Sequence, residues 1–197
     1  METLFEIMFR ILYHETRDKW KTAKNKYGGI YMNESQTFIF EKLPENLDEL
    51  KALPEATLDS PYKTAALAVA IFCAYGKNPD ATIEMLDWLM GPEEVSTYKK
   101  QFFKDRLSGK LYKPFSFFAG ANPENGYTPT APYTITVTSN DYSFVDENWA
   151  TMYVKSSGAD SERPIKLRKK PSTGQYFVND IQCFSDIKIP AAEDPWA

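Results

Sequence analysis

The segment from Ser60 to Gly76 restricts the possible folds of this chain more than any other part of the sequence. Ser60 followed by Pro61 is typical of the cap and the first position of a helix, and glycine commonly follows a helix end. Eleven consecutive apolar residues precede Gly76. A helix that is apolar on all sides has to be covered on all sides. The sequence therefore predicts a central helix enclosed by other elements.

Capping residues and apolar spacing predict further helices at residues 2–20, 46–53, 79–90 and 93–107, the last starting at either 93 or 96. The final helix is expected to direct four side chains inward: Tyr98, Phe102, Phe103 and Leu107. Two short apolar stretches, residues 30–32 and 37–40, are interpreted as a small hairpin. The first half of the chain is therefore expected to be mainly helical.

The apolar period changes from 3.6 to 2 at Tyr133. Residues 133–138 alternate strictly between threonine and apolar or aromatic side chains, as in a strand with one buried face. Turn residues separate four further strand candidates, at residues 149–155, 164–170, 175–179 and 183–189. Helices followed by consecutive strands predict an α+β fold, with an N-terminal helical layer and a C-terminal antiparallel meander of about four to five strands.

We expect a single domain over residues 1–197. Its parts are a mainly helical layer (1–110), an aromatic and proline-rich crossover (111–132), the antiparallel sheet (133–190) and a tail (191–197). The crossover contains too many aromatic residues for a flexible linker, so it is expected to pack in an ordered way across the core. The tail ends near Trp196, a large aromatic residue that is expected to dock.

Composition points to a soluble protein. The chain has 197 residues, a formal net charge of −4 and a pI near 5.2, which gives no general attraction to nucleic acid or to anionic membranes. The two cysteines, Cys73 and Cys183, do not form a secreted disulfide framework and are expected to be reduced. No signal peptide and no membrane-spanning apolar run are recognised. A cytoplasmic location without membrane or nucleic-acid partners is the simplest expectation.

The usual signatures of catalysis and metal binding are missing. The single histidine, His14, lies on a polar helix ridge, and the glycine-containing turns match neither a P-loop nor a dinucleotide fingerprint. Asp80, Glu84 and Asp87 share one helix face and offer a metal ligand set or an acid/base pair, but such acidic stripes are routine on surface helices. We predict no catalytic residue, no metal and no cofactor, and leave enzymatic activity undecided but disfavoured.

Positive charge is concentrated in two blocks. Residues 96–113 and 163–170 carry Lys99, Lys100, Lys104, Arg106, Lys110, Lys113, Arg163, Lys166, Arg168, Lys169 and Lys170. If the blocks meet in space, they form an anion site, for which the candidates are Lys104, Arg106, Arg163, Lys166 and Arg168. The ordinary alternative, which we favour, is that the first block complements a helix dipole and the second protects an edge strand.

A second group of candidates is aromatic. Tyr112, Phe117 and Tyr127 in the crossover, together with Tyr62 and Lys63 at the start of the central helix, are candidates for the lining of a pocket. Aromatic residues of this kind more often cover a core, and that interpretation is the simpler one.

Several stretches together resemble an uncharacterised bacterial family of Gram-positive anaerobes, a domain of unknown function. They include Ser60-Pro61-Tyr62-Lys63-Thr64, Gly91-Pro92, Gln101-Phe102-Phe103-Lys104-Asp105, Asn122-Pro123-Glu124-Asn125-Gly126-Tyr127 and Asp194-Pro195-Trp196. The resemblance extends over residues 43–196 and implies a bacterial, single-domain, intracellular protein. It implies no active residues.

These observations leave three hypotheses of function. The leading one is a non-catalytic intracellular binding or protein-interaction domain whose partner is another protein or an anionic ligand. The first alternative is a small enzyme or small-molecule carrier with a carboxylate, tyrosine or lysine site. The second alternative is an anion-binding or phosphate-binding surface formed by the two basic blocks. The sequence alone identifies neither a substrate nor a partner.

Overall fold

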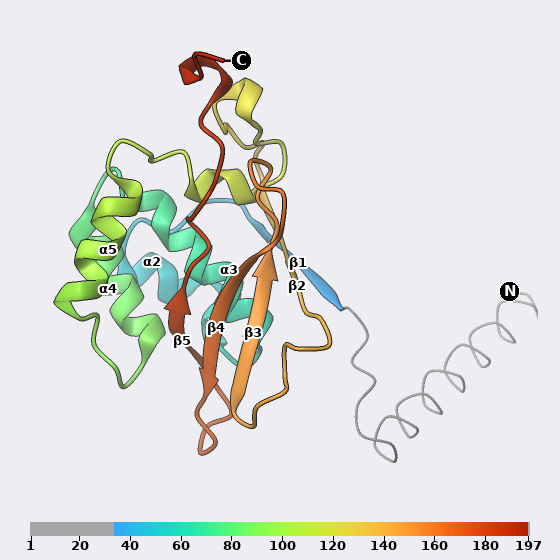
Figure 1. Ribbon diagram of the computed structural model, residues 1–197. Helices are drawn as coiled ribbons and strands as arrows, with labels where there is room; N and C mark the ends of the chain where they lie inside the picture. Colours follow the sequence, from blue (N-terminus) through green and yellow to red (C-terminus); the bar gives the residue numbers. More distant parts are fainter. Residues whose placement is uncertain (1–33, 197) are drawn as a thin grey trace, which may run out of the picture. The chain divides into compact units, whose positions relative to one another are not determined.

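The computed structural model describes residues 34–196, which lie in one compact unit. The predictions for the helix at 2–20, for His14 and for residues 30–32 fall outside the described residues. The unit has an α+β fold in which a five-stranded, fully antiparallel sheet packs on helices (Figure 1). This confirms the predicted fold class. None of the helices in the described part of the chain is long and apolar enough to cross a membrane.

The predicted helices from residue 46 to residue 107 are present. They are α2 (Leu47–Ala52), α3 (Pro61–Ala70), α4 (Pro79–Met90) and α5 (Thr97–Leu107), with short 3-10 helices η1 (Pro54–Thr57), η2 (Ile71–Ala74), η3 (Pro114–Phe117), η4 (Pro123–Asn125) and η5 (Ala191–Glu193). Side chains of Asn46, Asn78 and Ser96 cap α2, α4 and α5 by accepting backbone hydrogen bonds. Ser60 occupies the cap position of α3, but its side chain makes no capping hydrogen bond.

Helix α3 is the enclosed central element that the apolar run predicts. Every residue of α3 except Lys63 is buried, and the helix contacts all five strands. The α-helix ends at Ala70 and continues as η2 to Ala74, so Gly76 lies just beyond it. A Cβ atom on Gly76 would lie 2.7 Å from Leu111, so the glycine also makes room for the following crossover.

The sheet has the strand order β1 to β5. The strands are β1 (Ser35–Phe40), β2 (Tyr133–Thr138), β3 (Trp149–Val154), β4 (Arg163–Lys169) and β5 (Tyr176–Ile181). Strands β2 to β5 form the predicted meander. The fifth strand comes from the start of the described chain, where Ser35–Phe40 pairs with β2.

The predicted strand at residues 183–189 is wrong. This segment forms a turn in which Asp186 has a φ of 49°, a left-handed conformation that interrupts an extended strand. The prediction for the tail is also wrong, since the Trp196 side chain is 93% exposed and does not dock. Apolar alternation alone did not distinguish a twisted turn from a strand.

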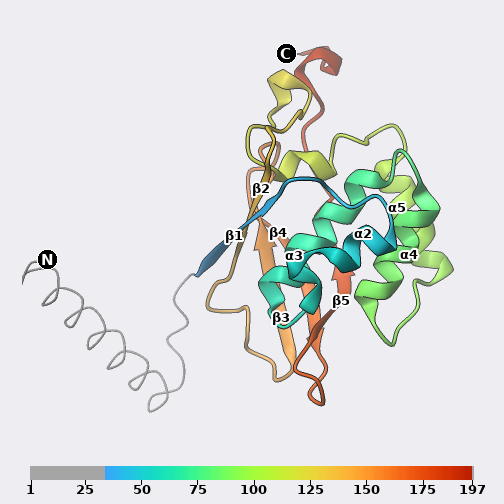
Figure 2. The ribbon, with the colours of Figure 1, turned by 180° about the vertical axis from the view of Figure 1, so that it is seen from behind.

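The two faces of the sheet differ. Helix α3 lies behind the sheet in Figure 1 and in front of it in Figure 2, so the helices cover one face. Ile165 and Leu167 point to that covered face, whereas Lys166 and Arg168 alternate with them and are exposed. The crossover is ordered as predicted: Phe117, Phe118 and Tyr127 are buried in the core.

Candidate functional site

Two adjoining cavities form a groove beside strand β5. The first, of about 260 Å³, lies where the end of α4 meets β4 and β5. The second, of about 440 Å³, lies between α5 and the second half of β5. Both cavities are lined by Met90, Val178 and Asn179, so they adjoin at these residues. We call this feature the α5–β5 groove.

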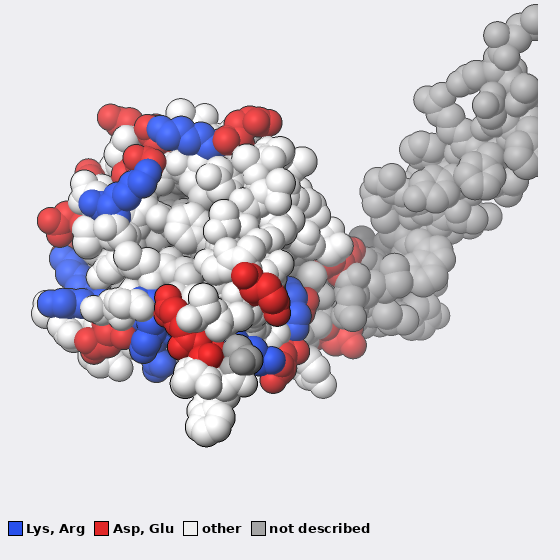
Figure 3. Space-filling view, turned by 90° about the horizontal axis from the view of Figure 1, so that it is seen from above, with Lys and Arg blue, Asp and Glu red and all other residues white. Residues whose placement is uncertain are grey.

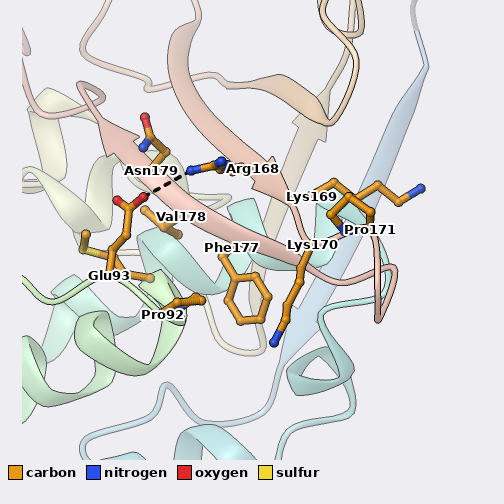
Figure 4. Close-up of a pocket in the computed structure, with 10 residues that line it drawn as sticks. Pro92, Glu93, Arg168, Lys169, Lys170, Pro171, Phe177, Val178 and Asn179 are labelled. Atoms are coloured by element: carbon orange, nitrogen blue, oxygen red, sulfur yellow. Dashed lines mark ion pairs between the residues drawn. The ribbon is translucent and has the colours of Figure 1, made fainter.

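Phe177 lines the first cavity and depends on a glycine for its position. Gly91 ends α4 with a φ of 68°, and a Cβ atom at this position would overlap the Phe177 ring. Only glycine combines this backbone conformation with the space that the ring needs. Lys170 extends in the same direction as Phe177, whereas Lys169 extends the opposite way (Figure 4), with its amine 5.7 Å from the centroid of the Tyr176 ring.

Arg168 reaches the rim of the same cavity. Its guanidinium carbon lies 5.4 Å from the centroid of the Trp149 ring on β3, and one of its nitrogens lies 3.5 Å from the Glu93 carboxylate (Figure 4). The two side chains of this ion pair are 60% and 48% exposed, so the pair adds little to stability. Arg168 is thus already held by neighbours on both sides.

The second cavity combines an aromatic ring with a cation. Phe102 and Arg106 are four residues apart on α5, and the guanidinium carbon of Arg106 lies 5.2 Å from the centroid of the Phe102 ring. Within residues 34–196, neither Arg106 nor Lys170 forms an ion pair with a carboxylate, and both are exposed. Each cavity therefore offers an aromatic ring and a cation that is available to an incoming anion.

Lys99 marks the junction of the two cavities. Its Nζ donates a hydrogen bond of 2.6 Å to the backbone carbonyl of Asn179 and lies 4.0 Å from the sulfur of Met90. Asn179 and Met90 are both shared between the cavities. Lys99 also satisfies an outward-facing carbonyl of the edge strand β5, which closes that position to strand addition.

The groove is positively charged although the chain is acidic. Leaving aside Lys169, whose amine extends away, four cations line the two cavities: Lys99, Arg106, Arg168 and Lys170. The carboxylates in the lining are two, Glu93 and Asp180, while the whole chain carries a net charge of −4. On the face seen in Figure 3, by contrast, acidic and basic residues are interspersed. A local excess of positive charge beside apolar surface favours ligands that carry both carboxylates and apolar groups.

The structure separates the five residues that the sequence suggested as an anion site. Arg106 and Arg168 line the groove at its two ends. Lys166 lies on the uncovered sheet face with its amine 4.7 Å from the centroid of the Trp149 ring. Lys104 is exposed and lines neither cavity, and Arg163 points to a different part of the molecule. The five residues therefore do not form one cluster.

The two basic blocks nevertheless meet at one turn. The buried Lys113 donates a hydrogen bond of 2.9 Å to the carbonyl of Phe184, and Arg163 donates one of 2.8 Å to the carbonyl of Asp186. Burial lowers the pKa of Lys113, and the nearby charges of Lys110 and Arg106 lower it further. These two cations stabilise the turn at residues 183–187 by satisfying its carbonyl groups.

The five pocket candidates do not line the groove. Tyr62 is buried and donates a hydrogen bond of 2.7 Å to Ser139, and Lys63 pairs with Asp59 at 2.9 Å. The other three belong to the core or its cover: Tyr112 stacks on Tyr127, and Phe117 packs edge-on against Phe184. Tyr127 donates a hydrogen bond of 2.7 Å to the carbonyl of Lys188, and burial raises its pKa to about 12.

Metal binding and thiol chemistry depend on the surroundings of the acidic residues and the cysteines. No group of three or more histidine, cysteine or acidic residues in the described part of the chain is arranged to hold a metal ion. The carboxylate of Asp87 accepts a hydrogen bond from the backbone of Val95, a structural role in the loop after α4. Both cysteines are free, and burial raises the pKa of the Cys183 thiol far above its usual range, which disfavours the reactive thiolate.

Lys99, Lys170, Met90 and Phe177 line the groove but were not singled out from the sequence. The two lysines belong to the basic blocks, yet nothing local distinguishes them from their neighbours. In the sequence, the Gly91-Pro92 pair follows the predicted helix at residues 79–90 and forms part of the family resemblance. Its positive φ and the nearby Phe177 ring show that the glycine also accommodates an aromatic side chain from 86 residues further along.

Comparison with known proteins gives a family but no function. No curated protein and no solved structure matches the chain. The model of a domain of unknown function, DUF6935, matches residues 42–191. This range includes α2 to α5, β2 to β5 and all residues of the groove, whereas β1 precedes it. The match covers most of the chain and agrees with the expected resemblance to a domain of unknown function. The chain therefore belongs to the family of the domain of unknown function DUF6935.

Proposed function

We propose that this domain is a non-catalytic binding module that holds an acidic segment of a partner protein in the α5–β5 groove. The observation that carries the proposal is the pairing of an aromatic ring with an available cation at each end: Phe102 with Arg106, and Phe177 with Lys170. A segment in which apolar and acidic residues alternate satisfies both ends, because each ring accepts an apolar side chain and each cation a carboxylate.

The mode of binding is through side chains. Strand β5 is closed to strand addition, because Tyr176 donates its N–H to the Leu58 carbonyl at 2.8 Å and accepts a hydrogen bond from Thr64 at 2.9 Å. The Asn179 carbonyl already accepts a hydrogen bond from Lys99. A ligand in this groove therefore gains affinity from charge and apolar burial and not from a backbone ladder. The setting that we propose is the interior of a bacterial cell, as the sequence resemblance implies.

The test is a titration with a defined probe. The probe is a fluorescein-labelled octapeptide that alternates glutamate and leucine, and its control carries glutamine in place of every glutamate. We expect saturable binding of the acidic probe with a Kd below about 1 mM, weakening as salt screens the charges, and at least about tenfold weaker binding of the control. Equal binding of both probes, or no saturation, would overturn the proposal.

Variants locate the binding site. Arg106→Glu combined with Lys170→Glu is expected to weaken binding of the acidic peptide at least about tenfold. Lys104→Glu combined with Lys110→Glu changes the net charge equally, but both residues are exposed and outside the cavities. This control is expected to change the affinity less than about threefold. A small anion such as phosphate that competes with the peptide at equal concentration would favour the anion-surface alternative over the protein-segment proposal.

A further inference from the structure

The second edge of the sheet, strand β1, differs from the closed edge at β5. Hydrogen-bonded and non-hydrogen-bonded pairs alternate along an antiparallel pair of strands, and this alternation shows which backbone groups of β1 point outward. Ser139 donates its N–H to the Glu34 carbonyl at 2.8 Å, so the hydrogen-bonded pairs with β2 continue through Gln36, Phe38 and Phe40. Ile39 lies opposite Thr134 in a pair without hydrogen bonds. The Thr134 carbonyl points away from β1 and accepts a hydrogen bond from the N–H of Ala119, as the alternation requires.

Three residues of β1 consequently direct both N–H and C=O away from β2: Ser35, Thr37 and Ile39. Within residues 34–196 these outward backbone atoms have no hydrogen-bond partner. The strand contains no lysine, proline, glycine or bulge, which are the devices that usually protect an edge. Its side chains Thr37 and Ile39 are exposed, Ile39 by 58%.

We infer that β1 pairs with β1 of a second copy of this chain, antiparallel and across a two-fold axis beside Thr37. Only one register matches all three outward residues with one another: Ser35 opposite Ile39, and Thr37 opposite Thr37. It forms six backbone hydrogen bonds and joins the two sheets into one. This inference is independent of the proposed groove, which lies beside the opposite edge strand of the sheet.

The charge and the side chains of β1 fit pairing with a second copy of the same strand. The six residues of β1 carry no charge, so the two copies bring no like charges directly opposite each other. In this register the exposed Ile39 lies over Ser35 and beside Thr37 of the other copy, which removes its apolar surface from water. The hydroxyl of Thr37 already pairs with that of Thr136 at 2.9 Å, which keeps this side chain in line on the same sheet face.

Cross-linking tests the register. In the full-length chain, Thr37→Cys places two thiols opposite each other with Cα atoms about 5.5 Å apart, within the range of a disulfide. Ser35→Cys is the matched control, because the two Ser35 positions lie about 13 Å apart along the paired strands. On oxidation with copper phenanthroline, which accepts the electrons of the two thiols, we expect T37C to form a covalent dimer at least about tenfold faster than S35C and than the wild-type chain. Equal rates would overturn the inference.

Sedimentation velocity tests the association itself. The wild-type chain is expected to sediment as a concentration-dependent dimer. Thr37→Lys places two ammonium groups beside the axis and is expected to raise the dimer Kd at least about tenfold. Thr136→Lys adds the same charge one strand further in and is expected to change the Kd less than about threefold; circular dichroism checks the folding of both. A wild-type chain that stays monomeric at all concentrations would contradict the inference. The same result is expected if residues 1–33 of the same chain cover the edge, so that alternative also counts against it.

Discussion

The ammonium group of Lys99 lies 2.6 Å from the backbone carbonyl oxygen of Asn179 and so joins α5 to the edge of β5. The two residues are 80 positions apart in the chain. Lys99 lines the second cavity, and Asn179 lines both, so this contact lies where the two cavities adjoin. The groove is therefore a consequence of tertiary packing, and it depends on a small number of long-range contacts that can be removed one at a time.

Replacing Lys99 tests how far this contact stabilises the fold. Lys99→Met keeps most of the aliphatic stem but leaves the Asn179 carbonyl without its donor, and is expected to reduce the free energy of unfolding by about 1–2 kcal/mol. Urea denaturation measures the effect. Lys100→Met, on the next and exposed position of α5, is the control and is expected to stay within about 0.5 kcal/mol of wild type. Equal effects of the two variants would show that the contact has no stabilising role.

Gly91 and Gly109 compare a glycine that lies against a side chain with one that faces open space. Both have positive φ, at 68° and 67°, but only at Gly91 would a Cβ atom meet a side chain, the ring of Phe177. Gly109→Ala is expected to cost about 1–2 kcal/mol from strain alone. Gly91→Ala is expected to cost about 2–4 kcal/mol, since its ψ of −116° lies outside the left-handed helical region and Phe177 must also move, and to weaken binding of the acidic peptide. Similar unfolding free energies for the two variants would contradict the assigned role of Gly91.

Alkaline pH is expected to destabilise the domain through Tyr127. Burial raises the pKa of this side chain from 10.0 to about 12, so the unfolded chain loses the proton at a lower pH than the folded chain does. The stabilisation is complete below pH 10 and falls by up to about 1.4 kcal/mol per pH unit between pH 10 and 12.

The matching variant is Tyr127→Phe, which cannot ionise. At pH 8 it is expected to be about 1 kcal/mol less stable than wild type, because the hydrogen bond to the Lys188 carbonyl is lost. Above pH 10 its stability is expected to decline less steeply than that of wild type, because its unfolding releases about one proton fewer. Urea midpoints measured from pH 8 to 11.5 give both slopes, and parallel curves would exclude Tyr127 as the titrating group.

The central helix and the meander could be predicted because their determinants are local. The apolar run before Gly76 requires burial wherever the helix lies, and the alternation from Tyr133 to Thr138 requires one covered face. The pairing of β1 with β2 could not be predicted in this way. Thr37 and Thr136 are 99 positions apart, and a short apolar stretch carries no information about which distant strand it will join.

The candidate site was recognised only in part. The sequence identified Arg106 and Arg168, which do line the groove, as parts of basic blocks, but it grouped them with Arg163, whose guanidinium is used to hold the turn at Asp186. Charge blocks mark regions of surface without showing which way each side chain points. The same holds for the aromatic candidates, because the sequence does not show whether an aromatic ring faces a ligand or the core. Phe117 and Tyr127 are core residues, and their burial leaves nothing for a ligand to contact.

The most direct measurement of the proposed function is a map of amide chemical shifts in the isotope-labelled full-length chain during titration with the acidic octapeptide. The account predicts that the largest shifts fall on residues lining both cavities, including Met90, Phe102 and Asn179, and that they disappear in the Arg106→Glu and Lys170→Glu double variant. Shifts confined to the uncovered sheet face around Trp149, or shifts that persist unchanged in the double variant, would contradict it.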